Sequence, residues 1–156
     1  MSLMSFEIAP QIHAASFFVR DLPLSQLRAM DDARFPWLLL VPRRSGVEEW
    51  CDLDSNDTIQ LAREITIVTR LLIRQSSPVK VNVATLGNIV RQLHVHVIAR
   101  QTTDPAWPGP VWGVGTAIPY SGPCKQRFCD ELLEILREVE MEPDASAGPH
   151  CTKEDA

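Results

Sequence analysis

The sequence contains no long hydrophobic run. No apolar stretch approaches the roughly 18 to 20 residues that a helix needs to cross a bilayer. The first ten residues also lack the basic-then-apolar order of a secretory signal. These absences predict a cytoplasmic protein without a membrane segment.

Basic charge is scarce as well. The chain has 15 Lys and Arg residues against 20 Asp and Glu residues, which gives a formal net charge of −5. Nucleic acids and anionic membranes are both held mainly by clustered basic side chains, so this balance argues against partners of either kind. Any contact with a phosphate group must therefore be local.

Cysteine is sparse and irregularly spaced. The chain has four cysteines, Cys51, Cys124, Cys129 and Cys151, and none forms the Cys-x-x-Cys spacing of a zinc knuckle or a redox pair. We predict free thiols, and the pair Cys124 and Cys129 stays open as a metal candidate.

The length and composition are those of an ordinary globular domain. A chain of 156 residues with 45% hydrophobic and 22% charged residues can bury most of its apolar surface in one core. We predict a single domain over residues 1–140. Residues 141–156 are small and polar, with Pro and Gly among them, and predict a disordered tail in which His150 and Cys151 have no role.

Hydrophobic periodicity predicts the elements of this domain. Short apolar or alternating runs predict strands over residues 15–19, 37–41, 80–84 and 92–99. Apolar residues at three- and four-residue steps predict helices over residues 55–75 and 125–140. Ser55 or Asp57 is available to cap the first of these helices. A weaker pattern predicts a short helical turn over residues 24–30.

A long segment without a predicted element lies between the last strand and the last helix. Residues 102–123 are rich in Pro and Gly and include Trp107 and Trp112. Structureless segments of this length are uncommon inside a compact domain unless they are functional. We predict a functional or interface loop.

The most informative segment is QLHVHVI, residues 92–98, which holds two of the four histidines. Successive side chains of a strand point to opposite faces, so Gln92, His94 and His96 share a face opposite the apolar residues. Polar groups on such a face are costly to bury unless other side chains, water or a ligand meet them. The pair of histidines is thus either structural or grips a small anionic group such as a phosphoryl centre. A metal site would need a third ligand, which the spacing does not place.

This segment resembles the signature of the histidine-triad nucleotide-binding and hydrolase family, His-φ-His-φ-His-φ-φ, with Gln92 in place of the first histidine. The similarity extends to Gly87 before the strand, to AMDDARFPWLLLVPRR at residues 29–44 and to the helix at residues 55–75. Together with DPAWPGPVWG at residues 104–113, these segments look like a bacterial subgroup of the family. The resemblance covers residues 15–113.

The resemblance implies roles for the three residues of the motif. His94 falls on the family's nucleophile, which attacks the α-phosphorus of a nucleotide and forms a nucleotidyl-histidine that water releases. His96 falls on the histidine that donates to the phosphate and to the leaving group. Gln92 replaces a histidine that supports the nucleophile; its amide can hold an orientation but carries no titrating proton.

The resemblance also implies residues that bind the substrate. Asn82 falls where the family has an amide near the phosphates or ribose, although a mid-strand Asn can also pair with the backbone. Asn88 after Gly87 is as well explained by turn chemistry, and the backbone N–H groups of residues 87–89 are better candidates to hold an anion. The base or ribose is expected at the aromatic and basic cluster of Arg34, Phe35 and Trp37. Trp112 is expected to contact the pocket or the partner subunit of a dimer.

Some polar residues have a simpler explanation. Asp31, Asp32 and the acidic residues between positions 48 and 54 follow no metal-loop spacing, so we expect solvated surface charge. Trp37 in the core and Trp112 in simple loop packing remain alternatives to their binding roles.

The fold implied is α+β: an antiparallel half-barrel sheet of about five strands, one long helix and a C-terminal helix, in a homodimer. The function implied is hydrolysis of a nucleotidyl phosphoanhydride or phosphoramidate bond, for example in diadenosine tetraphosphate. No cofactor is required, although Mg²⁺ can accompany a polyphosphate substrate. The alternatives are a purine-nucleotide-binding module with little turnover, and a metal-dependent enzyme that uses His94 and His96 as ligands.

Overall fold

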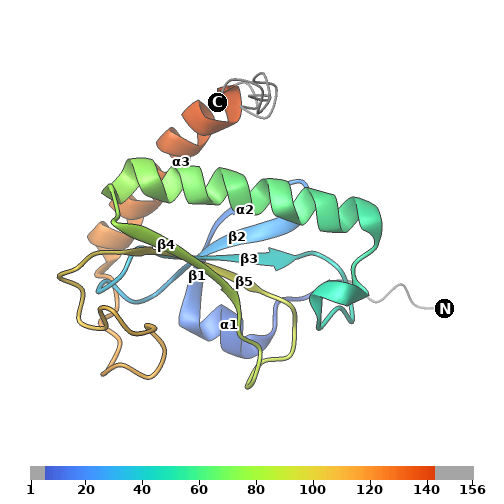
Figure 1. Ribbon diagram of the computed structural model, residues 1–156, viewed down its shortest axis with the longest axis horizontal. Helices are drawn as coiled ribbons and strands as arrows, with labels where there is room; N and C mark the ends of the chain where they lie inside the picture. Colours follow the sequence, from blue (N-terminus) through green and yellow to red (C-terminus); the bar gives the residue numbers. More distant parts are fainter. Residues whose placement is uncertain (1–5, 143–156) are drawn as a thin grey trace, which may run out of the picture.

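Five antiparallel strands form one sheet in the computed structural model, which describes residues 6–142 (Figure 1). The strand order is β1-β2-β3-β5-β4, so β5 is an inner strand and β4 is an edge. This sheet confirms the expected α+β fold. The strands are β1 (Ser16–Asp21), β2 (Ser25–Met30), β3 (Trp37–Pro42), β4 (Lys80–Thr85) and β5 (Val95–Arg100).

The two long helices cover one face of the sheet, and the opposite face carries a short helix and the long loop before the last helix (Figure 1). Helix α2 (Ser55–Ser76) lies across the sheet, and α3 (Gly122–Met141) packs against α2. Helix α1 (Pro10–Ala15) and the loop at residues 101–121 lie on the other side, and a 3₁₀ turn, η1 (Trp50–Asp52), precedes α2.

The alternation along β5 divides the core into two clusters. Leu93, Val95, Val97 and Ala99 are buried under the long helices, as the sequence pattern predicted. His96 and Ile98 point to the opposite face, where Ile98 packs with Phe35, Trp37 and Leu39. The position of the histidines is therefore fixed by the need to bury the apolar side of an inner strand.

The start of α2 differs in detail from the prediction. Asp54, which precedes both expected caps, accepts a hydrogen bond from the Asp57 backbone N–H at 2.8 Å. A buried carboxylate in the same helix is also paired: Glu64 accepts from the backbone N–H groups of Leu24 and Ser25 at 2.7 and 3.1 Å. This pairing holds the start of β2 against the helix.

The predicted helical turn over residues 24–30 is wrong, because Ser25–Met30 form strand β2. This segment pairs with β1 on one side and β3 on the other, and these ladders outweigh its local pattern. The largest shifts of a boundary are at the start of β5, which lies at Val95 rather than at residue 92, and at the start of α3, which lies at Gly122 rather than at residue 125. Helix α1 was not predicted from the sequence.

The predicted tail has only its first two residues within the described part of the chain. Met141 ends α3 and therefore belongs to a helix, whereas residues 143–156, with His150 and Cys151, lie outside the described residues. Within residues 6–142, no helix combines the length and the apolar character that crossing a bilayer requires. The cytoplasmic location stays a prediction.

Candidate functional site

His94 and His96 lie side by side at the start of β5. Both are buried, with 7% and 5% of their surface exposed, and their ring centroids are 4.8 Å apart. His96 is paired with Leu39 of β3 and Ala84 of β4, so strands on both sides hold it. The structure therefore brings together the two histidines that the motif singled out.

The backbone selects the tautomer of the neutral His94 ring. Its Nδ1 atom lies 2.6 Å from the carbonyl oxygen of Gln92. Because a carbonyl oxygen can only accept a hydrogen bond, Nδ1 carries the proton and Nε2 keeps its lone pair. An imidazole in this tautomer has its free nitrogen available as a nucleophile.

His94 lines a polar cavity of about 400 Å³ between the segment that joins β4 to β5 and the residues Glu48 and Glu49 before η1. Gly87 belongs to this segment, and a Cβ at its position would lie 3.1 Å from the Val90 carbonyl oxygen. A larger residue would therefore displace the segment. The predicted site residues Gly87, Asn88, Gln92 and His94 line this cavity. Thr85 and Arg91 line it as well, and the sequence did not predict them.

His96 has the opposite tautomer. Its Nδ1 atom lies 3.0 Å from the indole Nε1 of Trp37, which can only donate a hydrogen bond. In the neutral ring, the proton of His96 is therefore on Nε2, and this buried atom makes no hydrogen bond of ordinary geometry to any residue in the range 6–142. A buried polar atom without a partner calls for an explanation, and a bound ligand supplies one.

The surroundings of His96 keep the ring uncharged. Burial, and to a lesser extent the neighbouring His94, lower its pKa to about 4, and the backbone of Leu86 opposes this change. Trp37 and Trp112 contact the same ring, with centroids 5.5 and 5.1 Å away. At neutral pH this side chain is thus a neutral N–H donor in a dry aromatic environment.

The side chain of Gln92 has a different role from the one predicted. Its Oε1 accepts from the backbone N–H of Ala9, and its Nε2 donates to the carbonyl of Glu7, both at 2.8 Å. The amide therefore fastens the N-terminal segment, and the support for His94 comes from the backbone carbonyl of the same residue. Because any residue at position 92 has this carbonyl, the orientation of His94 does not require a histidine there.

Asn82 belongs to a buried ionic network. Its Oδ1 accepts from Arg100 Nη1 at 2.8 Å, and Arg100, 2% exposed, also binds Asp104 at 2.8 and 3.0 Å. Arg100 donates further to the carbonyl of Gly109. The network holds the long loop against the sheet, and Asn82 also lines a hollow beside Trp112. In the sequence, Arg100 falls on the same strand face as the two histidines, and Asp104 follows four residues later. This spacing is the signal from which the network could have been predicted.

Arg34 has partners within the fold and also lines a hollow of about 400 Å³ together with Trp37 and Trp112. Arg34 pairs with Asp32 at 2.6 and 2.9 Å and donates to the carbonyl of Val114 at 2.6 Å. Phe35 is 1% exposed. Asp32 is buried as well, which corrects the expectation of solvated charge: it accepts from Arg34 and from the Ile118 backbone N–H, and these bonds hold its pKa below the usual value against the effect of burial.

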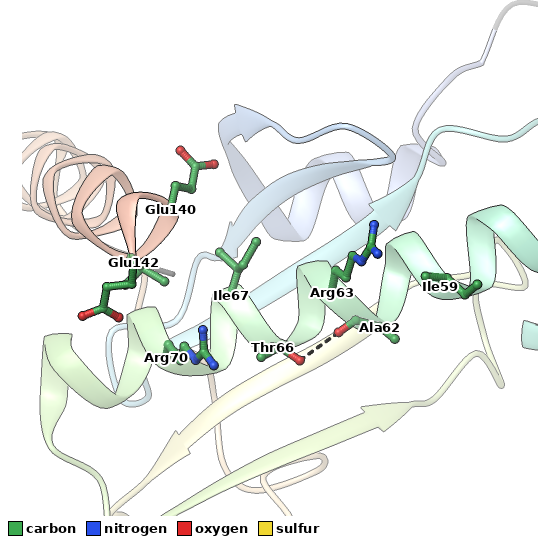
Figure 2. Close-up of a pocket in the computed structure, with 9 residues that line it drawn as sticks. Ile59, Ala62, Arg63, Thr66, Ile67, Arg70, Glu140 and Glu142 are labelled. Carbon is green, nitrogen blue, oxygen red and sulfur yellow. Dashed lines mark hydrogen bonds between the residues drawn. The ribbon is translucent and has the colours of Figure 1, made fainter. Parts of the chain in front are cut away.

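Two further features lie apart from the histidines. Between residues 6 and 142, no group of three His, Cys, Asp or Glu side chains could hold a metal ion, and Cys51, Cys124 and Cys129 are free thiols. A groove between α2 and the end of α3 is lined by Ile59, Arg63, Ile67 and Arg70 (Figure 2). It contains none of the predicted site residues.

The chain is similar to known proteins in both sequence and fold. The model of the HIT domain matches residues 11–103, which is more than half of the chain. The chain belongs to the histidine-triad (HIT) family. No match was found among curated proteins.

Solved HIT structures support this assignment. A histidine-triad protein from Bradyrhizobium japonicum is 42% identical, with a TM-score of 0.82 over 85% of this chain and 98% of that one. A HIT protein from Sinorhizobium meliloti is 41% identical, with a TM-score of 0.81 over 83% and 96%. The diadenosine triphosphate hydrolase of Plasmodium falciparum is 14% identical, with a TM-score of 0.56 over 90% and 87%, and shares the fold alone.

Proposed function

We propose that this HIT protein hydrolyses a nucleotidyl phosphoanhydride or phosphoramidate bond through a covalent intermediate on His94. The observation that carries the proposal is the bond from His94 Nδ1 to the Gln92 carbonyl, which leaves Nε2 as the nucleophilic nitrogen. Dinucleoside polyphosphates such as diadenosine tetraphosphate are the substrates we would test first.

In the first step His94 Nε2 attacks the α-phosphorus. A bond from nitrogen to phosphorus forms while the bond to the leaving group breaks, and the leaving group takes the electron pair. The imidazole then carries a proton on Nδ1 and phosphorus on Nε2, so its positive charge faces the Gln92 carbonyl. In the second step a water oxygen bonds to the same phosphorus, and the bond from phosphorus to Nε2 breaks with its electron pair returning to Nε2. A nucleoside monophosphate leaves, and the proton lost by the water passes to solvent.

His96 stabilises charge in both steps. Its buried Nε2–H makes no hydrogen bond of ordinary geometry within residues 6–142, and the backbone of Leu86 lies near the ring. The His96 and His94 ring centroids are 4.8 Å apart, so Nε2–H would donate to an oxygen of a phosphate that His94 attacks. Gly87, Asn88 and Arg91 line the cavity beside His94 and would meet the remaining phosphates, for which Arg91 would exchange its ion pair with Glu48. No cofactor enters these steps, and Mg²⁺ would come with a polyphosphate substrate.

The edge of the sheet supports assembly as a homodimer. Within residues 6–142, strand β4 pairs only with β5. Val83 in this strand and Leu86 directly after it are apolar, and they are 47% and 39% exposed. An unpaired edge with apolar side chains is a surface on which a second strand can pair. We propose that a second copy of this chain pairs with this edge. We also propose that the chain belongs to a bacterial-type HIT subgroup with Gln at the first triad position.

One observation favours a second candidate function, a nucleotide-binding module with little turnover. The Gln92 amide is committed to Glu7 and Ala9, so the first triad position brings no titrating group to His94. Protonation of the leaving group would then depend on His96, whose pKa of about 4 makes it a weak source of a second proton.

Intact-protein mass spectrometry after an acid-free quench separates the two candidates. The chain would be mixed with diadenosine tetraphosphate or adenosine phosphoramidate, beside His94→Ala and, as the matched control, His13→Ala, which removes an exposed histidine outside the cavity. Hydrolysis through His94 predicts an adduct of one nucleoside monophosphate in the native chain and in His13→Ala only. Binding of nucleotide without adduct or product would favour the binding module.

A further inference from the structure

The hydrogen bond from Trp37 to His96 assigns Trp37 a role that differs from base stacking. We propose that Trp37 is a positioning residue: its indole N–H sets the tautomer of His96 and so presents a neutral Nε2–H donor to the substrate phosphate. The part about the phosphate rests on the proposed function. The part about the tautomer rests on this structure alone.

Strand pairing places the two rings next to each other. Trp37 is opposite Ile98 and Leu39 is opposite His96, so Trp37 and His96 are diagonal neighbours on one face of β3 and β5. Their ring centroids are 5.5 Å apart, and the Nε1 to Nδ1 distance is 3.0 Å. Both side chains are buried, with 6% and 5% exposed.

The Trp37 ring is itself held in place. Phe35 contacts it edge-on at 6.4 Å and Trp112 at 5.7 Å, between centroids. Trp37 therefore cannot turn its N–H away without moving two other aromatic rings of a packed cluster. The donor is fixed before any substrate arrives.

The other protonation states of His96 conflict with this donor. A proton on Nδ1 would set two N–H groups against each other at 3.0 Å and leave the indole N–H without an acceptor in a buried site. The titratable group that faces His96 is His94, from the same segment, and a second positive charge there would be unfavourable. The remaining contacts are the Trp37 and Trp112 rings and the backbone of Leu86, and none of these supplies an acid to the ring.

The two histidines thus receive complementary tautomers from different parts of the fold. The Gln92 carbonyl puts the proton of His94 on Nδ1, and the Trp37 indole puts the proton of His96 on Nε2. One ring offers a lone pair and its neighbour offers an N–H. This is the pairing that attack on a phosphorus and donation to its oxygen require.

The test is the tautomer of His96, measured by two-bond ¹H–¹⁵N correlation on the full chain labelled at histidine nitrogen. In the native protein we expect the pattern of a neutral ring protonated on Nε2 from pH 5.5 to 8. In Trp37→Phe we expect the ratio of Nε2–H to Nδ1–H forms to fall by about 2- to 12-fold, since one hydrogen bond is lost. The pKa of His96 should rise in this variant, because donation to Nδ1 favours the neutral ring.

Trp112→Phe is the matched control, because Trp112 contacts the same ring without a hydrogen bond to it. It should leave the tautomer unchanged. A native His96 protonated on Nδ1, or a Trp37→Phe spectrum identical to the native one, would overturn the proposal. Should Trp37→Phe fail to fold, the native spectrum still decides, since it must show Nε2–H. Absence of turnover in the native chain would refute the proposed function and leave the tautomer assignment standing.

Discussion

Lowering the pH should destabilise the protein through His96 before its carboxylates titrate. The pKa of this ring is about 4 in the folded chain, against an ordinary value of 6.5 in the unfolded chain. Between these two values the unfolded state binds a proton that the folded state does not. The free energy of unfolding therefore falls as the pH drops from about 6.5 to about 4, and this contribution is constant below that range.

The magnitude follows from the size of the shift. A difference of about 2.5 pKa units at roughly 1.36 kcal/mol per unit corresponds to about 3 kcal/mol. Since the ring is only 5% exposed, solvent screening reduces this figure little. The carboxylates with lowered pKa values, among them Asp32 and Asp104, lose their contribution at lower pH, below about 4.

Urea unfolding followed by tryptophan fluorescence at pH 7.5, 6.5, 5.5 and 4.5 measures this effect. His96→Asn removes the titrating group, and His13→Asn removes an exposed histidine as the matched control. The native chain and the control should lose about 2 to 3 kcal/mol over this range that His96→Asn does not lose. Parallel pH profiles for all three proteins would refute the burial argument for His96.

Three further substitutions test the supports of the site by urea unfolding. Asp104→Asn leaves Arg100 buried without its carboxylate and should cost about 3 to 5 kcal/mol; a loss below 1 kcal/mol would contradict the network. Gly87→Ala should lower the free energy of unfolding by about 1 kcal/mol and weaken nucleotide binding, because the added Cβ meets the Val90 carbonyl oxygen. Gly122→Ala is the control: its Cβ would meet open space, and neither effect is expected. Asp54→Ala should cost about 1 kcal/mol through loss of the α2 cap, and no loss would mean that Ser55 or Asp57 caps instead.

The sequence predicted the elements whose local pattern agrees with their final environment. The alternation in β5 and the apolar steps of α2 each bury the face that the pattern selects, so both were predicted correctly. The prediction for the β2 segment failed because Leu24, Leu27 and Met30 recur at a spacing that also fits a helix. Only pairing with β1 and β3 makes this segment a strand.

The same distinction applies to the site. The motif identified His94 and His96, because it states which residues share a face. The partners that set their tautomers and hold the loop are distant in sequence: Trp37 from His96 by 59 residues, Gln92 from Ala9 by 83, Arg34 from Val114 by 80. No spacing rule reaches that far, so the sequence did not predict these contacts of Trp37 and Arg34, and their contact with a substrate stays a prediction.

The glutamine that we propose at the first triad position can be understood from these contacts. What His94 requires from position 92 is a carbonyl oxygen, and the backbone supplies it whatever the side chain is. The side chain is then available for another task, and here its amide joins Glu7 and Ala9. An imidazole has a donor and an acceptor too, but on a rigid ring whose geometry differs from that of an amide.

Gln92→His should therefore change the N-terminal segment more than it changes the nucleophile. We expect His94 to stay protonated on Nδ1 in the ¹H–¹⁵N correlation, while the backbone N–H of Ala9 exchanges with solvent about 5- to 100-fold faster, as loss of two hydrogen bonds worth about 1 to 3 kcal/mol together implies. Gln92→Ala should show the same exchange. If instead the His94 tautomer changes in Gln92→His and Ala9 stays protected, then the side chain at position 92 acts on the nucleophile, and the family's histidine is missing from this site at a catalytic cost.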